Sequence, residues 1–388
     1  MAFAKGVYIQ DIDGNQTVEG VFLVQSRQTG TTRKGDPFLK LKLSDRTGML
    51  EARVWSNTPA IAVRFNQGDF VFLHARSEVY QGIVQLNLID LTVVPDDKVD
   101  LSDYLPATRF DIDALEAQLR ALVESVVRSP WIRTFLMSVL DDGVVRPRFR
   151  IAPAATVNHH NYIGGLLEHV LSMARLALQI ARHYDRYYPG AVDTDLLVAG
   201  VVLHDIGKIT ELSYDREFAY TDEGELIGHL VTGVGLVQRI ADAIPEFPPD
   251  LMLKLQHLVV SHHGKLEFGS PKKPRIIEAI LLHEIDIIDS RMNAFANLLA
   301  HRGADPEAEE PAQGTWSEFS RMFEVKMLLP PESGYRWAAQ PDFAASDLLG
   351  PGLAGQDLAP AGAAPRANGT HGRVEAAHRS LAQLNLLE

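Results

Sequence analysis

Apolar and polar positions alternate in short segments over the first hundred residues of this 388-residue chain. Five segments alternate or run apolar: "VEGVFLVQSRQT", "PFLKLKLSD", "MLEARVWS", "GDFVFLHARSEVY" and "IVQLNLIDLTVV". Turn residues separate several of them, as in "RTG" and "QG", and no long stretch repeats with a helical period. This spacing predicts a small all-β barrel or sandwich over residues 15–95.

Five short strands that close on themselves are typical of an OB-fold, a barrel that binds oligonucleotides on one face. The pattern by itself fits any small antiparallel barrel as well. Aromatic and basic residues interleave here, and the candidates for nucleic-acid contact are Phe38, Trp55 and Tyr80 for base stacking, with Lys40 and Arg53 for phosphates. Each of these aromatic side chains could instead belong to the core.

The hydrophobic period changes to that of an α-helix after a polar, proline-marked linker at 96–110. Asp111 or Asp113 is placed to cap "DIDALEAQLRALVESVV", and Ser129 to cap "SPWIRTFLMSVLDD". A longer amphipathic helix is expected in "YIGGLLEHVLSMARLALQIARHY". Further helices are expected at 194–207, 228–242, 250–263, 274–300 and 315–325. Residues 111–330 are therefore predicted to form an all-α domain.

Residues 338–388 are rich in Ala, Gly and Pro. Such a composition cannot form a packed core and predicts disorder. The final stretch "RVEAAHRSLAQLNLLE" has the pattern of a short amphipathic helix, with a frayed tail as the alternative.

Composition narrows the class of protein. The chain has no cysteine, which excludes disulfides and thiolate metal sites. We find no signal-peptide pattern and no apolar run of the ~18 residues that span a bilayer, so we expect a cytoplasmic protein without membrane contact. The net charge of −13 argues against a nucleic-acid binder. Residues 17–95, however, carry nine basic and seven acidic side chains, and a local basic surface decides such binding.

Histidines and aspartates recur at apolar positions of the predicted helices. His169 lies on an apolar helix face, His204 and Asp205 follow a nearly all-aliphatic run, and Asp286 lies within "AILLHEIDIID". A buried imidazole or carboxylate without a partner costs several kcal/mol. A lone histidine of this kind is usually a core residue with an ordinary partner, but metal coordination satisfies a whole set at once.

The segments "GGLLEH", "LHDIGK", "GH", "SHHG" and "HEIDIID" resemble, in order, the H…HD…H…HH…D pattern of HD-domain metal-dependent phosphohydrolases. Together with the OB-like region, "HHNYIGGLLEHV" and "SHHGKLEFGSPKKP" resemble the YhaM family of 3′→5′ exoribonucleases over about residues 15–330. The resemblance implies two metal sites with Asp205 as the bridge. The first is made by His169, His204, Asp205 and Asp286. The second is made by His229 and His262, with His263 as a further ligand or as a support behind the ligands.

The implied cofactor is a pair of divalent ions. Imidazole and carboxylate ligands suit Mn, Fe, Co, Ni or Zn, and Mg less well. The resemblance favours Mn²⁺. It also implies a catalytic role for Asp205. Lys208 is expected to contact a phosphate, with a lysine that merely ends a helix as the alternative. His160 is expected either to contact the scissile phosphate or to support the ligands from behind. The basic residues Lys272, Lys273 and Arg275 either hold the RNA backbone or form a solvated loop.

The implied reaction is hydrolysis of single-stranded RNA from its 3′ end to nucleoside 5′-monophosphates. One alternative is an HD phosphohydrolase acting on a small nucleotide or a cyclic dinucleotide, because the fold supports many substrates. Another is a single-strand-binding protein without catalysis. The sequence leaves open whether single-stranded DNA is also cut and whether the chain forms a homo-oligomer.

Overall fold

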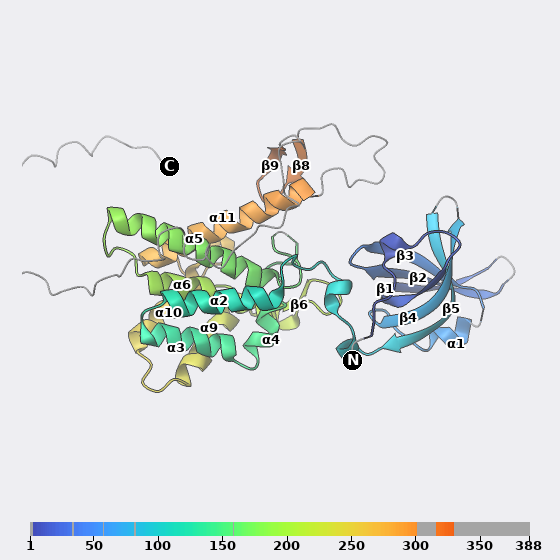
Figure 1. The fold of residues 1–388 in the computed structure, drawn as a ribbon, viewed down its shortest axis with the longest axis horizontal. Coiled ribbons are helices and arrows are strands. Elements are labelled where there is room, and N and C mark those ends of the chain that lie inside the picture. The colour runs from blue at the N-terminus through green and yellow to red at the C-terminus, as the bar shows by residue number, and fades with distance from the viewer. Residues whose placement is uncertain are drawn as a thin grey trace, which may run out of the picture. The chain divides into compact units, whose positions relative to one another are not determined.

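A computed structural model describes residues 3–32, 35–56, 58–80, 83–157, 159–300 and 316–329 (Figure 1). The tail expected at 338–388 lies outside the described residues. Within them, no helix is both long and apolar enough to cross a membrane.

The N-terminal region is a closed five-stranded barrel. Its strands are β1 (Thr17–Thr31), β2 (Pro37–Asp45), β3 (Gly48–Val54), β4 (Phe70–Tyr80) and β5 (Ile83–Val94). The strand order is β1-β2-β3-β5-β4, in which the long, bulged β1 pairs with both β2 and β4 and a parallel β3–β5 pair closes the ring. The helix α1 (Thr58–Ala62) lies between β3 and β4. This topology confirms the predicted OB-fold.

Alternation explains the barrel interior. On β2, Leu39, Leu41 and Leu43 are fully buried, while Lys40 and Lys42 between them face outward. The predicted linker is more ordered than its polarity suggested. It contains the short 3₁₀ helices η2 (Asp96–Lys98) and η3 (Leu101–Asp103), and Tyr104 after them packs its ring 4.6 Å from that of Phe70.

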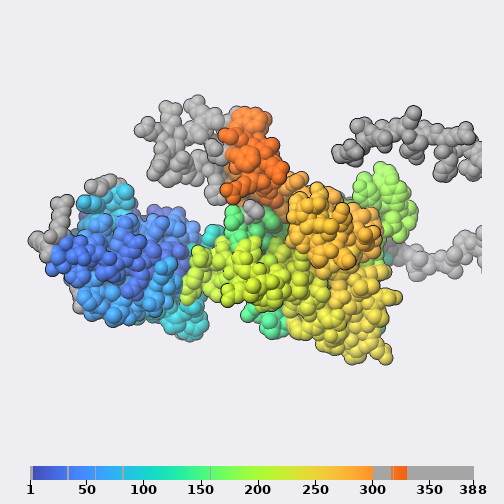
Figure 2. Space-filling model, turned by 180° about the vertical axis from the view of Figure 1, so that it is seen from behind, coloured from blue at the N-terminus to red at the C-terminus, as the bar shows by residue number. Residues whose placement is uncertain are grey.

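The region from residue 112 to residue 300 is mostly helical, as predicted. The principal helices are α2 (Ile112–Val126), α3 (Pro130–Asp141), α5 (Gly165–Tyr187), α6 (Thr194–Leu203), α9 (His229–Asp242), α10 (Pro249–Ser261) and α11 (Ile277–Ala300). Asp111 and Ser129 accept from the backbone N–H groups that begin α2 and α3, so both caps are confirmed. In the view of Figure 2 the surfaces of α9 and α10 (yellow) adjoin that of α11 (orange).

The core of the helical region is centred on α6. All residues from Leu196 to Leu203 are buried, and α6 packs against α5, α10 and α11. Short elements fill the connections, namely α4 (Val145–Phe149), α7 (Lys208–Glu211), β6 (Leu212–Ser213), β7 (Ala219–Tyr220), α8 (Asp222–Leu226) and η4 (Leu266–Phe268). The site described next lies at the end of α6.

The prediction of a helix at 315–325 is wrong. Residues there form β8 (Trp316–Ser320), which pairs with β9 (Val325–Leu328) in an antiparallel hairpin. Trp316 pairs with Leu328 and Ser320 with Val325. Glu324 turns the chain at φ +58°, a left-handed conformation that no α-helix contains. Pairing with a partner strand thus overrode the local helical pattern.

Candidate metal centre

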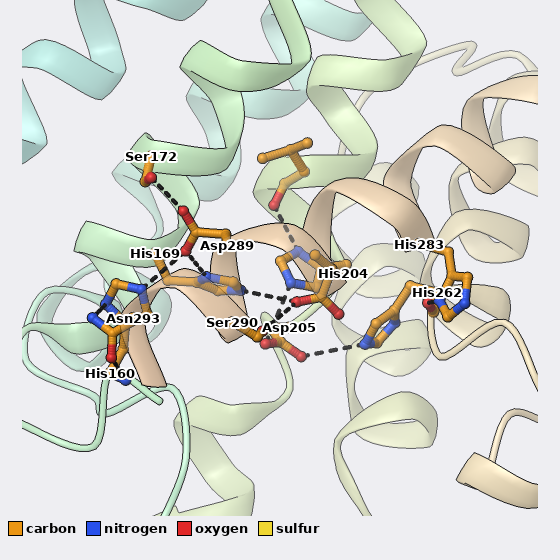
Figure 3. Close-up of polar contacts among 12 residues, drawn as sticks. His160, His169, Ser172, His204, Asp205, His262, His283, Asp289, Ser290 and Asn293 are labelled. Carbon is orange, nitrogen blue, oxygen red and sulfur yellow. Dashed lines mark hydrogen bonds and ion pairs between the residues drawn. The ribbon is translucent and has the colours of Figure 1, made fainter. Parts of the chain in front are cut away.

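Five helical elements bring histidine and aspartate side chains together at one end of α6. His169 is the fifth residue of α5, His229 starts α9, and Asp286 lies in α11. His204 and Asp205 directly follow α6, while His262 and His263 follow α10. Figure 3 shows that the side chains of His169, His204, Asp205 and His262 point toward one another.

A first cluster contains the four residues expected for the first metal site. His169, His204 and Asp205 are fully or almost fully buried, and one donor atom from each lies within 4.8 Å of the others. His169 Nε2 faces Asp286 Oδ1 at 3.4 Å, and His204 Nε2 lies 3.3 Å from Asp205 Oδ2. His169 is therefore common to a close set with His204 and Asp205 and to a contact with Asp286.

A second cluster shares Asp205 with the first. Asp205 Oδ1 lies 3.4 Å from His262 Nε2 and 3.6 Å from His229 Nε2. His263 joins this group, since its Nε2 is 3.2 Å from His229 Nε2. The two oxygens of Asp205 thus face different clusters, as the bridging role requires.

Four of these histidines are held by hydrogen bonds from Nδ1, the ring nitrogen that faces away from the clusters. Nδ1 of His204, His262 and His263 donates to a backbone carbonyl at 2.8 Å in each case, and Nδ1 of His229 donates to Glu211 Oε1 at 2.8 Å. Such a hydrogen bond fixes the tautomer and leaves Nε2 with a free lone pair. The Nε2 atoms that face the clusters are therefore prepared as metal ligands.

Several buried polar atoms at this place have no hydrogen-bond partner. They are His169 Nε2, His204 Nε2 and Asp205 Oδ1, with His159 Nδ1 beside them. Leaving such atoms buried and unpaired costs about 1–3 kcal/mol each. Divalent ions would satisfy them together, so the donors present fit the implied metals.

The electrostatics agree with a site for cations. Burial alone would raise the pKa of Asp205, but the Lys208 ammonium and the imidazoles of His204 and His262 hold it well below its usual range. Burial lowers the pKa of His262 to about 3, so that ring is neutral at pH 7. Burial also opposes charge on His169, but the carboxylates of Asp286 and Asp289 raise its pKa to about 10.

Lys208 lies inside the site and does not end a helix. The helix α6 stops at Leu203, and Lys208 begins the short helix α7. Its ammonium donates to Asp205 Oδ2 at 2.6 Å. The interpretation of Lys208 as a helix C-terminal lysine is therefore wrong, and the expectation that helix 194–207 runs through His204 and Asp205 is corrected as well.

Gly207 lets two ligand-bearing elements approach each other. A Cβ at this position would lie 2.1 Å from the carbonyl oxygen of His229 and 2.8 Å from the backbone nitrogen of Gly233. Its φ of −66° is ordinary, so close contact and not backbone conformation requires glycine here. The tight turn brings Asp205 and the start of α9 together.

His160 lies behind the ligands. It is buried, its Nε2 donates to Asp289 Oδ2 at 2.9 Å, and its Nδ1 accepts from the Tyr162 hydroxyl at 2.8 Å. The same Asp289 oxygen accepts from His169 Nδ1 at 2.8 Å (Figure 3). Both nitrogens of His160 are occupied, which favours the supporting role over contact with the scissile phosphate.

Sequence reasoning missed several residues of this network. Asp289 orients His169, and Glu211 orients His229. Asp289 lies three residues after Asp286 on α11, so helical spacing could have identified it. Glu211 carried no comparable signal, because its role depends on contacts across the fold. His159 stood out only as the sequence neighbour of His160.

The candidate nucleic-acid residues on the barrel gather on its surface. The rings of Phe38 and Trp55 stack with centroids 5.1 Å apart, and the Arg53 guanidinium lies 5.5 Å from Trp55 and 5.9 Å from Tyr80. Trp55 and Tyr80 are exposed, so the core alternative is wrong for these two, while Phe38 is half-buried. Lys40 pairs with Glu51 at 2.6 Å.

The second basic group lies in the segment between η4 and α11. The side chains of Lys272, Lys273 and Arg275 are all exposed. The backbone of this segment is anchored where the Arg275 N–H donates to His257 Nε2 at 2.9 Å. The basic side chains are therefore presented from a fixed segment.

Comparison with known proteins relates this chain to an HD-domain family and to exoribonucleases. A family model described as "HD domain" matches residues 166–291. The 3′-5′ exoribonuclease YhaM of Halalkalibacterium halodurans is 36% identical over 285 residues, which cover 73% of this chain and 86% of that protein. The protein of the same name from Bacillus subtilis is 34% identical over 297 residues, covering 76% and 91%.

Solved structures resemble the barrel. The second OB-fold domain of replication protein A from Methanococcus maripaludis is 13% identical, with a TM-score of 0.20, over 23% of this chain and 93% of that one. The mitochondrial single-stranded DNA binding protein Rim1 from S. cerevisiae is 16% identical, with a TM-score of 0.19, over 21% and 96%. At such scores the OB-fold assignment depends on the strand topology given above.

Proposed function

The chain belongs to the YhaM family of 3′-5′ exoribonucleases, and from this premise we propose that its metal centre hydrolyses single-stranded RNA from the 3′ end to nucleoside 5′-monophosphates. The observation that carries this proposal is the pair of clusters that share Asp205, with buried nitrogen and oxygen atoms left unpaired between them. We assign His169, His204, Asp205 and Asp286 to one ion and His229, His262, His263 and Asp205 to the other.

Divalent ions held there would lower the pKa of a water molecule and neutralise the phosphoryl oxygens as negative charge develops. The protein supplies the orientation. Hydrogen bonds from Nδ1 to carbonyl and carboxylate oxygens keep the histidine donors aimed inward. Lys208 keeps Asp205 ionised and places a point charge that can hold a phosphate oxygen.

We assign RNA capture to the barrel region at 15–95 and hydrolysis to the helical region at 111–330. Stacking rings and an adjacent guanidinium are the combination that holds single strands without sequence preference. The group of Phe38, Arg53, Trp55 and Tyr80 has this chemistry. Lys272, Lys273 and Arg275 are assigned to the RNA backbone, and a cytoplasmic place of action fits an RNA substrate.

The decisive test is degradation of a 5′-labelled oligoribonucleotide with Mn²⁺. We expect the wild-type protein to shorten it stepwise from the 3′ end. Asp205→Ala removes the carboxylate common to both clusters, so the ladder should disappear, with a loss of at least about 10³-fold in rate. Asp215→Ala removes an exposed aspartate of the β6–β7 turn and should leave the rate unchanged.

Three results would contradict the proposal. Release of the labelled 5′-terminal nucleotide alone would refute the direction of attack. An Asp205→Ala protein with wild-type rate would refute the site. Turnover of a mononucleotide or cyclic dinucleotide, with RNA left intact, would favour the small-nucleotide phosphohydrolase.

The RNA-binding role of the barrel makes a second prediction. Trp55 is 46% exposed, so Trp55→Ala removes a stacking surface without opening the core. We expect RNA affinity to fall by about 1–3 kcal/mol, or roughly 5- to 150-fold, with the melting temperature unchanged. Fluorescence anisotropy with a labelled oligoribonucleotide measures this. Tyr187→Ala, which removes an exposed aromatic ring of α5, is the matched control, and an equal loss for both variants would exclude a specific barrel surface.

A further inference from the structure

His159 and His160 are neighbours in sequence but have different surroundings. Their rings are nearly perpendicular, at 89°, with centroids 6.2 Å apart. His160 uses both ring nitrogens within the supporting network. His159 is partly exposed, and its Nδ1 is nevertheless buried without a hydrogen-bond partner.

The His159 ring lies against the first cluster. Its centroid is 5.6 Å from that of His169, and donor atoms of His159, His169 and Asp286 all lie within 4.8 Å of one another. Among the described residues, the other imidazole and carboxylate atoms that are buried and unpaired belong to His169, His204 and Asp205. His159 Nδ1 is therefore one more buried, unpaired donor atom, on a residue that is grouped with His169 and Asp286 of the first cluster.

The loop that carries His159 is held by specific contacts. His160 adopts a left-handed conformation with φ +44°, which is uncommon for a residue other than glycine and has to be maintained by its surroundings. The Asn293 side chain accepts from the His160 N–H at 2.8 Å, and the His160 carbonyl accepts from the Ala154 N–H at 3.0 Å. A Cβ on Gly165 would lie 2.0 Å from that carbonyl, so the start of α5 is built to fit this loop. Strain that the surrounding structure maintains is typical of functional sites.

We propose that His159, through Nδ1, is a fifth protein ligand of the first metal ion, in addition to His169, His204, Asp205 and Asp286. The inference rests on the metal centre proposed above. His159 is not part of the H…HD…H…HH…D pattern. That pattern supplies this ion with two imidazole ligands, those of His169 and His204. A third imidazole raises the preference for Mn²⁺, Co²⁺ or Ni²⁺ over Mg²⁺, because Mg²⁺ prefers oxygen ligands.

The test measures metal binding apart from catalysis. Metal-free full-length protein is titrated calorimetrically with Co²⁺ and with Mg²⁺. The variants are His159→Ala and His159→Phe, and the second keeps the ring volume against His169 while removing both nitrogens. The control is His183→Ala, which removes an exposed histidine of α5. Affinity of each metal-free protein for an oligoribonucleotide is measured in parallel.

We expect both His159 variants to bind the first Co²⁺ at least about tenfold more weakly, with a smaller loss for Mg²⁺ and unchanged metal-free RNA affinity. The control should match the wild type. Unchanged Co²⁺ affinity in His159→Phe would overturn the inference. If the same variant also bound RNA more weakly, His159 would be a substrate contact. A wild-type protein that binds no ion would instead refute the metal centre, and the two failures are therefore distinguishable.

Discussion

Asp289 shares one carboxylate oxygen between two buried histidines. Its Oδ2 accepts from His169 Nδ1 at 2.8 Å and from His160 Nε2 at 2.9 Å, while its other oxygen accepts from the Ser172 hydroxyl (Figure 3). An ionised carboxylate can accept all three hydrogen bonds, and an amide cannot. Asp289 is therefore a positioning residue that sets the orientation of His169.

Asp289→Asn tests this at the scale of one residue. The amide oxygen can still accept from both histidines, but the negative charge that strengthens these hydrogen bonds and makes His169 a more basic ligand is lost. We expect metal affinity to fall by about 10- to 100-fold, as for other partners of metal-bound histidines. Calorimetric titration with Mn²⁺ measures the change. Asp142→Asn, which breaks an ion pair with Arg239 elsewhere in the helical region, should keep wild-type metal affinity. Equal affinity in both variants would show that Asp289 does not orient His169.

At the scale of elements, the junction of α6, α7 and α9 decides whether the two clusters share Asp205. The chain leaves α6 at Leu203 and reaches α7 at Lys208, and the turn between them packs against the first turn of α9. His229 is thereby fixed by its own backbone N–H as well as by its ring, since both donate to Glu211 Oε1. Small backbone shifts at this junction would separate His229 from Asp205.

Gly207→Ala should open this junction. The added methyl meets backbone atoms of His229 and Gly233 that cannot rotate away. Overpacking of this kind costs about 1–3 kcal/mol, and we expect lower stability together with weaker binding of the second ion. Urea unfolding and metal titration measure the two effects.

Gly235→Ala on α9 is the matched control for Gly207→Ala. A Cβ there meets nothing within 4 Å, and alanine favours the helix, so stability should rise by about 0.4–1 kcal/mol. A Gly207→Ala protein that behaves like this control would show that the close approach is not needed.

At the scale of the whole molecule, the barrel and the helical region each have a hydrophobic core of their own. The core of the helical region borders the buried histidines and aspartates of the metal centre. Their unpaired polar atoms destabilise the protein when no metal is bound. His169 carries a proton in that state, because Asp286 and Asp289 raise its pKa to about 10. An ion must displace this proton, so metal affinity should increase with pH.

Metal binding should therefore stabilise the protein measurably. At an Mn²⁺ concentration 100 times the Kd, linkage contributes about 2.7 kcal/mol, which corresponds to a rise in melting temperature of roughly 5–10 °C for a domain of this size. A chelator should reverse the rise, and the Kd should be lower at pH 8 than at pH 6. Differential scanning calorimetry checks the first point, and titration at the two pH values checks the second. A melting temperature that is insensitive to metal would contradict a filled site in the core.

Features that depend on a few neighbouring residues could be predicted from the order of the amino acids. Alternation specified the strands of the barrel, side-chain caps at Asp111 and Ser129 specified helix starts, and motif spacing identified the histidines and aspartates of the centre. These features need only a few neighbouring residues, because side-chain period and capping chemistry act within one or two turns.

Other features of the protein depend on contacts between segments that are far apart in the chain. The φ angle of His160, set by contacts to Ala154 and Asn293, sends one histidine behind the ligands and its neighbour into the cluster. Strand pairing made a hairpin of a segment with a helical pattern, and Gly207 has its role only because α9 packs against it. Each of these outcomes depends on residues far apart in the chain, whose proximity no local pattern encodes.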